Sequence, residues 1–188
     1  MPLRVPRVAG AGGDHAAAVP DLKGSQVHGF PAYVGLGSNL REPAAQVEAA
    51  FAALAALPQT LLVCRSSLYG SRPMGELAQP DFCNAVAGLL TGLNATELLA
   101  EMRGIEKRFG REPSRVRWGP RVLDLDLLSF GEQRSADPAL LLPHPGIAER
   151  AFVLHPWREF APDVLVPGIG RVAELAARLP SDGLWKIA

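Results

Sequence analysis

The sequence has few cysteines and no excess of charge of either sign. Its 188 residues include two cysteines, Cys64 and Cys83, which lie in apolar stretches without metal-ligand spacing. We therefore expect both thiols to be reduced core residues of a cytoplasmic protein. Lysine plus arginine and aspartate plus glutamate each number 19, so the formal net charge is zero. No general electrostatic field attracts nucleic acid or an anionic membrane, and any binding of phosphate must be local.

The sequence also lacks a long apolar run and a glycine-rich phosphate loop. No apolar run approaches the ~20 residues needed to span a bilayer. No glycine-rich loop ends in Gly-Lys-Ser or Gly-Lys-Thr, so a P-loop is not how ATP would be held. Residues 1–30 mix glycine and proline without periodicity, and they contain no signal-peptide core. We expect 1–30 to be a disordered N-terminal extension and 31–188 to be a single domain.

The most informative segment that is present covers residues 117–128, where an arginine-rich loop leads into an apolar strand. Side chains alternate across a strand, so Leu123, Leu125 and Leu127 share one face while Asp124 and Asp126 share the other. The two carboxylates would lie about 6.5–7 Å apart at the backbone. They would repel each other unless a cation neutralised them, and Mg²⁺ suits carboxylate oxygens. The same alternation is typical of a half-solvated sheet, so the pair alone leaves both interpretations open.

Arginines before this strand favour the phosphate interpretation. Arg111, Arg115, Arg117 and Arg121 are crowded into one short loop. A guanidinium is a planar fork that matches phosphate oxygens and stays charged at every relevant pH. The segment therefore predicts a metal site beside a positively charged loop.

Periodicity and capping signals indicate alternating strands and helices. Strands are expected over 32–36, 61–69, 82–90 and the segment of the two aspartates. Helices are expected over 42–57, from a cap at Asn94 with Glu97 to Gly110, over 147–150, as a turn near 158–160, and over 172–179. These lengths suit an α+β sandwich with a largely antiparallel sheet.

Several motifs together resemble those of the 6-hydroxymethyl-7,8-dihydropterin pyrophosphokinase family. The resemblance covers about residues 32 to 166, and its most specific part is the run Arg117-Trp118-Gly119-Pro120-Arg121 with the following Asp124-Leu125-Asp126. The other motifs are Gly35-Leu36-Gly37-Ser38-Asn39-Leu40, Gln79-Pro80-Asp81-Phe82-Cys83-Asn84, Gly110-Arg111, Pro143-His144-Pro145 and Glu149-Arg150-Ala151-Phe152-Val153-Leu154. The resemblance implies a ferredoxin-like three-layer α/β/α sandwich. It also implies transfer of pyrophosphate from ATP to the hydroxymethyl group of a reduced pterin, with release of AMP.

The resemblance further implies roles on the nucleotide side of the site. Asp124 and Asp126 would hold two magnesium ions, and Arg111 and Arg121 would clamp the phosphates. Residues expected to contact ATP are His144, Arg150, Glu106, Trp118 and Arg117. Trp118 would ride on a loop that closes over the site, although this chain has Glu112-Pro113-Ser114 where family members often carry further basic residues.

On the pterin side, the resemblance implies two rings that stack on the pterin and one amide that hydrogen-bonds its edge. Phe82 and Phe152 would sandwich the bicyclic ring, and Asn84 would read its edge with a donor and an acceptor. Ser71, Arg72 and Met74 would supply contacts from a loop. A pair of phenylalanines is more often simply core, but an asparagine inside an apolar strand needs hydrogen-bond partners.

Two other functions would share part of this pattern. A two-metal nucleotidyl transferase also uses paired aspartates, but it does not explain the aromatic and amide residues, and the neutral charge disfavours a nucleic-acid substrate. A binding module without catalysis is disfavoured by the intact aspartates and arginines. The expected partners are therefore ATP and a reduced hydroxymethylpterin, with no nucleic acid and no membrane, and the expected state is a monomer.

Overall fold

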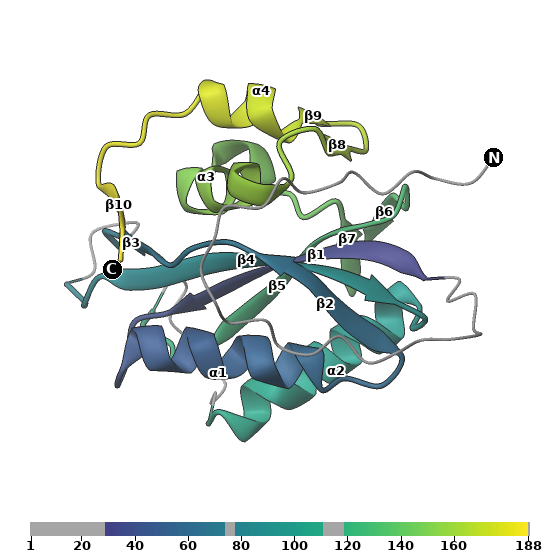
Figure 1. Ribbon diagram of the computed structural model, residues 1–188, viewed down its shortest axis with the longest axis horizontal. Helices are drawn as coiled ribbons and strands as arrows, with labels where there is room; N and C mark the ends of the chain where they lie inside the picture. The colour runs from purple at the N-terminus through teal and green to yellow at the C-terminus, as the bar shows by residue number, and fades with distance from the viewer. Residues whose placement is uncertain (1–28, 74–77, 111–118, 188) are drawn as a thin grey trace, which may run out of the picture.

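The computed structural model describes residues 29–73, 78–110 and 119–187. They form three layers, in which one main sheet lies between two layers of helices (Figure 1). Its strands run in the order β10-β3-β4-β1-β5, with β2 also paired to β4, and every pairing is antiparallel. Their bounds are β1 Phe30–Ser38, β2 Thr60–Arg65, β3 Tyr69–Ser71, β4 Phe82–Thr91, β5 Asp124–Phe130 and β10 Leu184–Lys186. Figure 1 shows α1 (Pro43–Ala55) and α2 (Ala95–Arg108) on one face, and α3 (Ala151–Phe160) and α4 (Val172–Ala177) on the other. The expected α/β/α sandwich is confirmed.

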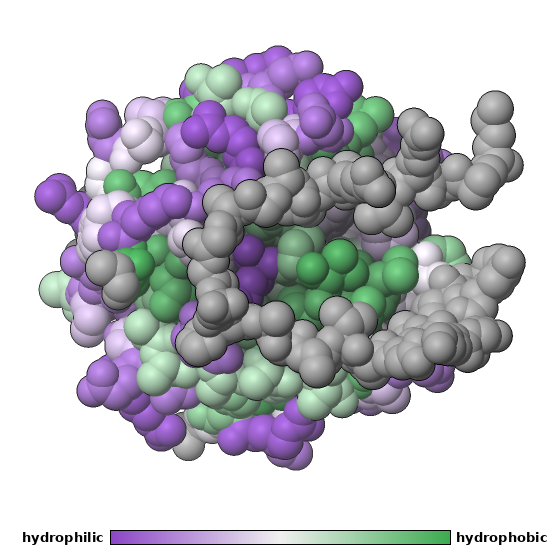
Figure 2. Space-filling view, in the orientation of Figure 1, coloured by the Kyte–Doolittle hydropathy of each residue, from purple (hydrophilic) through white to green (hydrophobic). Residues whose placement is uncertain are grey.

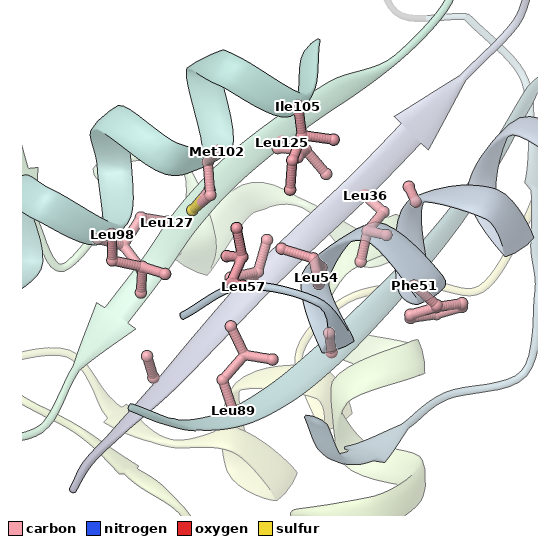
Figure 3. Packing of buried hydrophobic residues seen from close by; sticks show 14 of the residues in the cluster. Leu36, Phe51, Leu54, Leu57, Leu89, Leu98, Met102, Ile105, Leu125 and Leu127 are labelled. Atoms are coloured by element: carbon pink, nitrogen blue, oxygen red, sulfur yellow. The ribbon is translucent and has the colours of Figure 1, made fainter. Parts of the chain in front are cut away.

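The larger core lies between the sheet and helices α1 and α2. Alternation along β5 turns Leu125 and Leu127 towards this core, where Met102 and Ile105 of α2 lie beside them (Figure 3). The capping box at the start of α2 is confirmed, because Asn94 Oδ1 accepts from the backbone N–H of Glu97 at 3.0 Å and Glu97 Oε2 accepts from that of Asn94 at 2.8 Å. This core supports β1, β4 and β5 on the face of the sheet that α1 and α2 cover.

A second core lies between the opposite face of the sheet and helices α3 and α4. Val86 and Leu128 of the sheet meet Leu154 and Trp157 of α3, and Tyr33 lies with its ring centroid 4.8 Å from that of Trp157. The sequence suggested separate short turns here, but α3 is one continuous helix that contains Pro156. Burial of its apolar face outweighs the backbone hydrogen bond that a proline cannot donate. The expected helix over 147–150 is one 3₁₀ turn, Ile147–Glu149.

The strand expected over 61–69 is wrong in one respect, because it is interrupted. Both β2 and β3 pair with β4, and the chain between them leaves the regular ladder at Ser66. The backbone N–H of Val86 donates to the hydroxyl of Ser66 at 3.0 Å, while the N–H of Ser66 donates to the carbonyl of Val86 at 2.9 Å. The hydroxyl thus takes the place of a backbone carbonyl, as serine side chains do when they compete with a ladder.

Smaller elements complete the chain. Two short hairpins consist of β6 (Ser135–Asp137) with β7 (Leu140–Leu142) and β8 (Leu165–Val166) with β9 (Gly170–Arg171). The peptide bond between Leu142 and Pro143 is cis. Both cysteines are free thiols, and burial raises the pKa of Cys83 to about 11, with the charge of Glu48 adding to the effect.

Figure 2 shows hydrophilic and hydrophobic residues mixed over the described part of the visible surface, with an apolar area in the region of β1 and β2. Leu61 and Val63 of that strand are exposed. Among helices of the described ranges, none is long and apolar enough to cross a membrane.

Candidate active site

The candidate site is a cavity of about 400 Å³ at the end of the sheet where β1 finishes and β4 and β5 begin. It lies on the face of the sheet that α3 covers, and the first residues of α3 form part of its wall. Ten of the predicted site residues line it: Ser71, Arg72, Phe82, Asn84, Arg121, Asp124, Asp126, His144, Arg150 and Phe152. The predicted residues Met74, Arg111, Arg117 and Trp118 lie outside the described residues.

Glycines of the central strand β1 form the floor of this cavity. Gly35 is paired with Asp126, and Gly37 is paired with Asp124 on one side and Asn84 on the other. A Cβ atom added to Gly37 would lie 3.4 Å from Oδ1 of Asn84. The absence of side chains here leaves space above the backbone between the aspartates and the asparagine.

The two aspartates point to the same side of β5, as the alternation predicts, and each is paired with an arginine. Arg121 contacts Asp124, and Nη1 of Arg150 lies 3.2 Å from Oδ2 of Asp126. Burial and the charge of Asp124 raise the pKa of Asp126, although the nearby cations act in the opposite direction. A further cation in the cavity would stabilise the ionised form of this carboxylate, which burial and Asp124 disfavour.

The donor set fits magnesium better than a metal that prefers an all-protein cage. Within the described ranges, no group of three or more histidine, cysteine or acidic side chains could hold a metal ion. Two carboxylates beside an open cavity leave the remaining coordination positions to water and substrate phosphates. Magnesium is commonly bound in this way, through one or two carboxylates and the phosphates of the substrate.

His144 and Arg150 both lie near Asp126 and line the cavity. The backbone N–H of Gly146 donates to Nδ1 of His144 at 3.1 Å, so the proton of the neutral ring belongs on Nε2. That Nε2 lies 3.9 Å from Oδ2 of Asp126. Burial lowers the pKa of His144 and Arg150 adds to this, although Asp126 opposes it. The histidine is therefore a neutral donor that faces the cavity near neutral pH.

Arg150 also connects the two halves of the site. Its guanidinium lies 5.9 Å from the ring centroid of Phe152 as well as against Asp126. Gly146 leaves room for this position, because a Cβ atom there would lie 2.6 Å from Nε of Arg150. Arg150, which the sequence predicts to contact ATP, thus lies between the carboxylate of Asp126 and the ring of Phe152.

The aromatic half of the cavity contains Phe82, Phe152 and the buried Asn84. Both rings are half-buried and line the cavity. Nδ2 of Asn84 donates to the hydroxyl of Ser71 at 2.9 Å, which leaves Oδ1 near Gly37. The hydrogen-bond partner that a buried amide requires is therefore present, and it comes from the neighbouring strand β3.

Glu106 lies away from the cavity lining. It is buried in the core on the α2 side, and its Oε1 accepts from the backbone N–H of Leu125 at 2.8 Å. It therefore holds β5 at the residue between Asp124 and Asp126. The contact with ATP expected for Glu106 stays a prediction.

Asn39 is a residue of the site region whose role the sequence did not indicate. Its Oδ1 accepts from the backbone N–H of Arg121 at 2.7 Å, and its own N–H donates to the carbonyl of Arg121 at 3.0 Å. Its Nδ2 donates to Oε1 of Gln79 at 3.0 Å and to the carbonyl of Pro80 at 3.1 Å. Its place at the end of β1, after Gly37 and Ser38, was the available signal, since a buried amide after a strand must find partners.

Fold and site together place two carboxylates paired with arginines beside two half-buried aromatic rings, on one face of an α/β/α sandwich. Comparison with known proteins gives the family: the model described as 7,8-dihydro-6-hydroxymethylpterin-pyrophosphokinase (HPPK) matches residues 33–162. The chain belongs to this pyrophosphokinase family.

Curated relatives agree with the family model. The 2-amino-4-hydroxy-6-hydroxymethyldihydropteridine pyrophosphokinase of Pseudomonas aeruginosa is 46% identical over 155 residues, which cover 82% of this chain and 95% of that protein. The protein of the same name from Haemophilus influenzae is 40% identical over 156 residues, covering 83% of this chain and 97% of that one.

Solved structures of low identity share the fold. The wild-type HPPK-DHPS of Plasmodium falciparum with pterin and p-hydroxybenzoate gives a TM-score of 0.67 at 13% identity. The match covers 85% of this chain but 45% of that one, so this chain spans less than half of the solved protein. At this identity the likeness concerns the fold alone.

Proposed function

We propose that the two halves of the cavity hold the two substrates of the family reaction. In that reaction the chain transfers a pyrophosphoryl group from ATP to the hydroxymethyl group of 6-hydroxymethyl-7,8-dihydropterin, a step of folate biosynthesis. One observation carries the assignment of the halves: the aspartates of β5 and Asn84 of β4 face the same cavity on either side of the glycines of β1. The carboxylates and arginines form the ATP half, and the rings with the amide form the pterin half.

In the ATP half, Asp124 and Asp126 would hold two magnesium ions. When bound, the metal ions would neutralise charge on the phosphate oxygens and on the attacking and leaving oxygens. The fit rests on two adjacent carboxylates, of which Asp126 has a raised pKa, beside an open cavity. Hard oxygen ligands with free positions for phosphate are what magnesium requires.

Arginine and histidine side chains supply the remaining charge and donors of the ATP half. Arg121 contacts Asp124 and lines the cavity, so its guanidinium is within reach of phosphates held at that carboxylate. Two preorganised N–H donors of one guanidinium can stabilise charge that develops on a transferred phosphoryl group. His144 would donate through Nε2 to the nucleotide, because Gly146 already occupies Nδ1.

In the pterin half, the flat ring would lie between Phe82 and Phe152. Both rings line the cavity, and offset stacking on a bicyclic ring is favourable. Asn84 would read the edge of the pterin through Oδ1, since Ser71 accepts one proton of its amide nitrogen. Arg150, between Phe152 and Asp126, stands where the hydroxymethyl group must meet the phosphates.

Three wider proposals complete this function. Residues 31–188 form one catalytic domain, preceded by an extension over 1–30. The protein acts as a monomer. It works in the cytoplasm with reduced thiols. Sedimentation of the full chain measures its oligomeric state directly, and a stable dimer would contradict the proposed monomer.

The products of the reaction test the proposed function. The full chain is incubated with ATP, magnesium and the reduced hydroxymethylpterin, and the nucleotide products are separated. We expect AMP to form in equal amount with the pterin diphosphate, and only when the pterin is present. Formation of ADP would indicate transfer of a single phosphoryl group, and release of free pyrophosphate would indicate a nucleotidyl transferase. Either result contradicts the proposal.

A further inference from the structure

The C-terminal strand β10 lies outside the part of the chain that matches the family model, which ends at residue 162. It nevertheless completes the main sheet at the end that holds the pterin half of the site. Figure 1 shows β10, in yellow, beside β3. Leu184, Trp185 and Lys186 pair with Ser71, Gly70 and Tyr69 of β3. Without β10, the three-residue strand β3 would be an uncovered edge of the sheet.

The side chain of Trp185 lies directly on the backbone of Gly70. A Cβ atom added to Gly70 would be 2.1 Å from Cε2 of the indole and 2.4 Å from its Nε1. Only glycine allows this contact, because every other residue would push the ring away. The indole thus holds the residue that immediately precedes Ser71.

Polar contacts fix the rest of β10. Lys186 contacts Glu159 of α3, and Glu159 accepts from the backbone N–H of Ser67 at 2.7 Å and from its hydroxyl at 3.0 Å. The N–H of Ile187 donates to the carbonyl of Leu68 at 2.9 Å. The segment before β3 is therefore tied to α3 and to the C-terminal end of the chain, and after β3 the N–H of Arg72 donates to the carbonyl of Gly183 at 3.4 Å.

The strand that β10 holds carries the partner of the pterin-reading amide. The hydroxyl of Ser71 accepts from Nδ2 of Asn84 in a buried contact of 2.9 Å. This hydrogen bond anchors the Asn84 amide beside the cavity, with its Oδ1 near Gly37. A shift of β3 would remove this anchor, and the amide would no longer be held in one position for the pterin.

We propose that β10 is part of the pterin-binding apparatus, with Trp185 as a positioning residue that acts through Gly70, Ser71 and Asn84. This inference rests on the proposed function, which assigns Asn84 to the pterin. It extends the apparatus of the substrate site to a strand that does not itself line the main cavity. It also explains why Leu184 and Gly183 border a smaller hollow that shares Ser71, Arg72 and Phe152 with the main cavity.

The test compares the affinities for the two substrates in Trp185→Ala. Calorimetry measures binding of the hydroxymethylpterin in the presence of magnesium and a non-hydrolysable ATP analogue, and separately the binding of that analogue alone. We expect pterin affinity to fall about five- to tenfold, the effect of losing one well-placed buried hydrogen bond. Affinity for the ATP analogue should stay within twofold of wild type. Trp185→Phe, which keeps a ring over Gly70, should recover most of the pterin affinity.

Two further variants separate positioning from general destabilisation. Phe30→Ala removes a half-exposed ring from the opposite end of the sheet, where Phe30 lies 5.2 Å from the Phe130 ring centroid, and it should leave both affinities unchanged. Gly70→Ala should reproduce Trp185→Ala, because its Cβ displaces the indole. The double variant should be no worse than either single one, since the clash disappears with the ring.

The outcomes distinguish this inference from the proposed function. If Asn84→Ala weakens pterin binding but Trp185→Ala does not, the inference is wrong and the proposed function stands. If both affinities fall equally in Trp185→Ala, the strand has only a general structural role, and the inference is also wrong. If Asn84→Ala leaves pterin binding unchanged, the pterin assignment fails and the inference fails with it.

Discussion

Asn39 binds the backbone of Arg121 on both sides, accepting from its N–H at 2.7 Å and donating to its carbonyl at 3.0 Å. The two residues are far apart in the sequence, yet this pair of bonds fixes where the loop before β5 enters the site. The amide nitrogen of Asn39 also binds Gln79 and Pro80. One buried side chain thus connects the end of β1 with the segments that precede β4 and β5.

Asn39→Ala should therefore lower both stability and turnover. It leaves the backbone N–H of Arg121 without this acceptor, so we expect the free energy of unfolding to fall by about 1–3 kcal/mol, measured by urea denaturation. Turnover should fall as well, because Arg121 loses its position. Asn94→Ala is the matched control: it removes a helix cap and costs about 1 kcal/mol, but lies far from the site and should keep full turnover. Equal activity of the two variants would show that Asn39 serves stability alone.

Replacement of either aspartate of β5 should abolish pyrophosphoryl transfer without unfolding the protein. Asp124→Ala and Asp126→Ala remove the proposed magnesium ligands, so AMP formation should fall to background at any magnesium concentration. Asp163→Asn, at an exposed carboxylate beside Arg171, should behave as wild type. Turnover near the wild-type level in either β5 variant would remove that carboxylate from the metal site.

The stability of Asp126→Asn without magnesium gives an independent measure of the same site. Burial and Asp124 raise the pKa of Asp126, which means that folding makes its ionised form more costly. A neutral amide removes this cost, so the urea midpoint of the variant at neutral pH should be no lower than that of wild type. A clear loss of stability would show that the pair with Arg150 outweighs burial.

Arg121→Ala should slow the chemical step more than it weakens ATP binding. Loss of one donor to the developing charge reduces turnover by on the order of 10²–10³-fold. Arg121→Lys should recover part of it, because it restores the charge without the planar fork. Single-turnover kinetics at saturating ATP measure the step. An unchanged rate would assign Arg121 to structure, as a partner of Asp124 only.

Phe152→Ala should weaken pterin binding and leave the ATP analogue unaffected. The ring lines the cavity and is half-buried, so its removal takes away one of two stacking faces. Phe160→Ala is the control, because that ring packs 6.4 Å from Tyr33 in the second core, away from the cavity. Pterin affinity equal to wild type in Phe152→Ala contradicts the stacking role.

The contact between Glu159 and Lys186 should make stability depend on pH in the acid range. Burial opposes ionisation of Glu159, but hydrogen bonds from Lys186 and Ser67 outweigh it and lower the pKa below the usual 4.5. A lowered pKa in the folded state stabilises the protein above the unfolded value, and this contribution is lost as pH falls through the folded value. Urea midpoints of wild type and Glu159→Gln should differ most above pH 4.5 and converge at lower pH. A constant difference across the range would exclude the linkage.

The sequence carried the parts of the fold and site that depend on local pattern. Alternation placed Asp124 and Asp126 opposite Leu125, and the capping signal at Asn94 located α2, because both follow from backbone geometry alone. The role of Asn39 could not be found in this way, since its partners are determined by how distant loops meet. The interruption at Ser66 depends on one hydroxyl that binds Val86 across the sheet. The pairing of β10 with β3 likewise depends on tertiary structure, and the three residues of β10 carry no local pattern that predicts it.

The alternation along β5 has a consequence for how this site can vary. Leu125 and Leu127 are held in the core on one side, so Asp124 and Asp126 keep a spacing determined by the backbone repeat and not by their own contacts. The backbone repeat of the strand therefore sets the separation of the two proposed magnesium ligands. Insertion or deletion of one residue within it would exchange the faces, sending carboxylates into the core and leucines into the cavity. The register of this strand therefore cannot change by one residue without removing both carboxylates from the cavity.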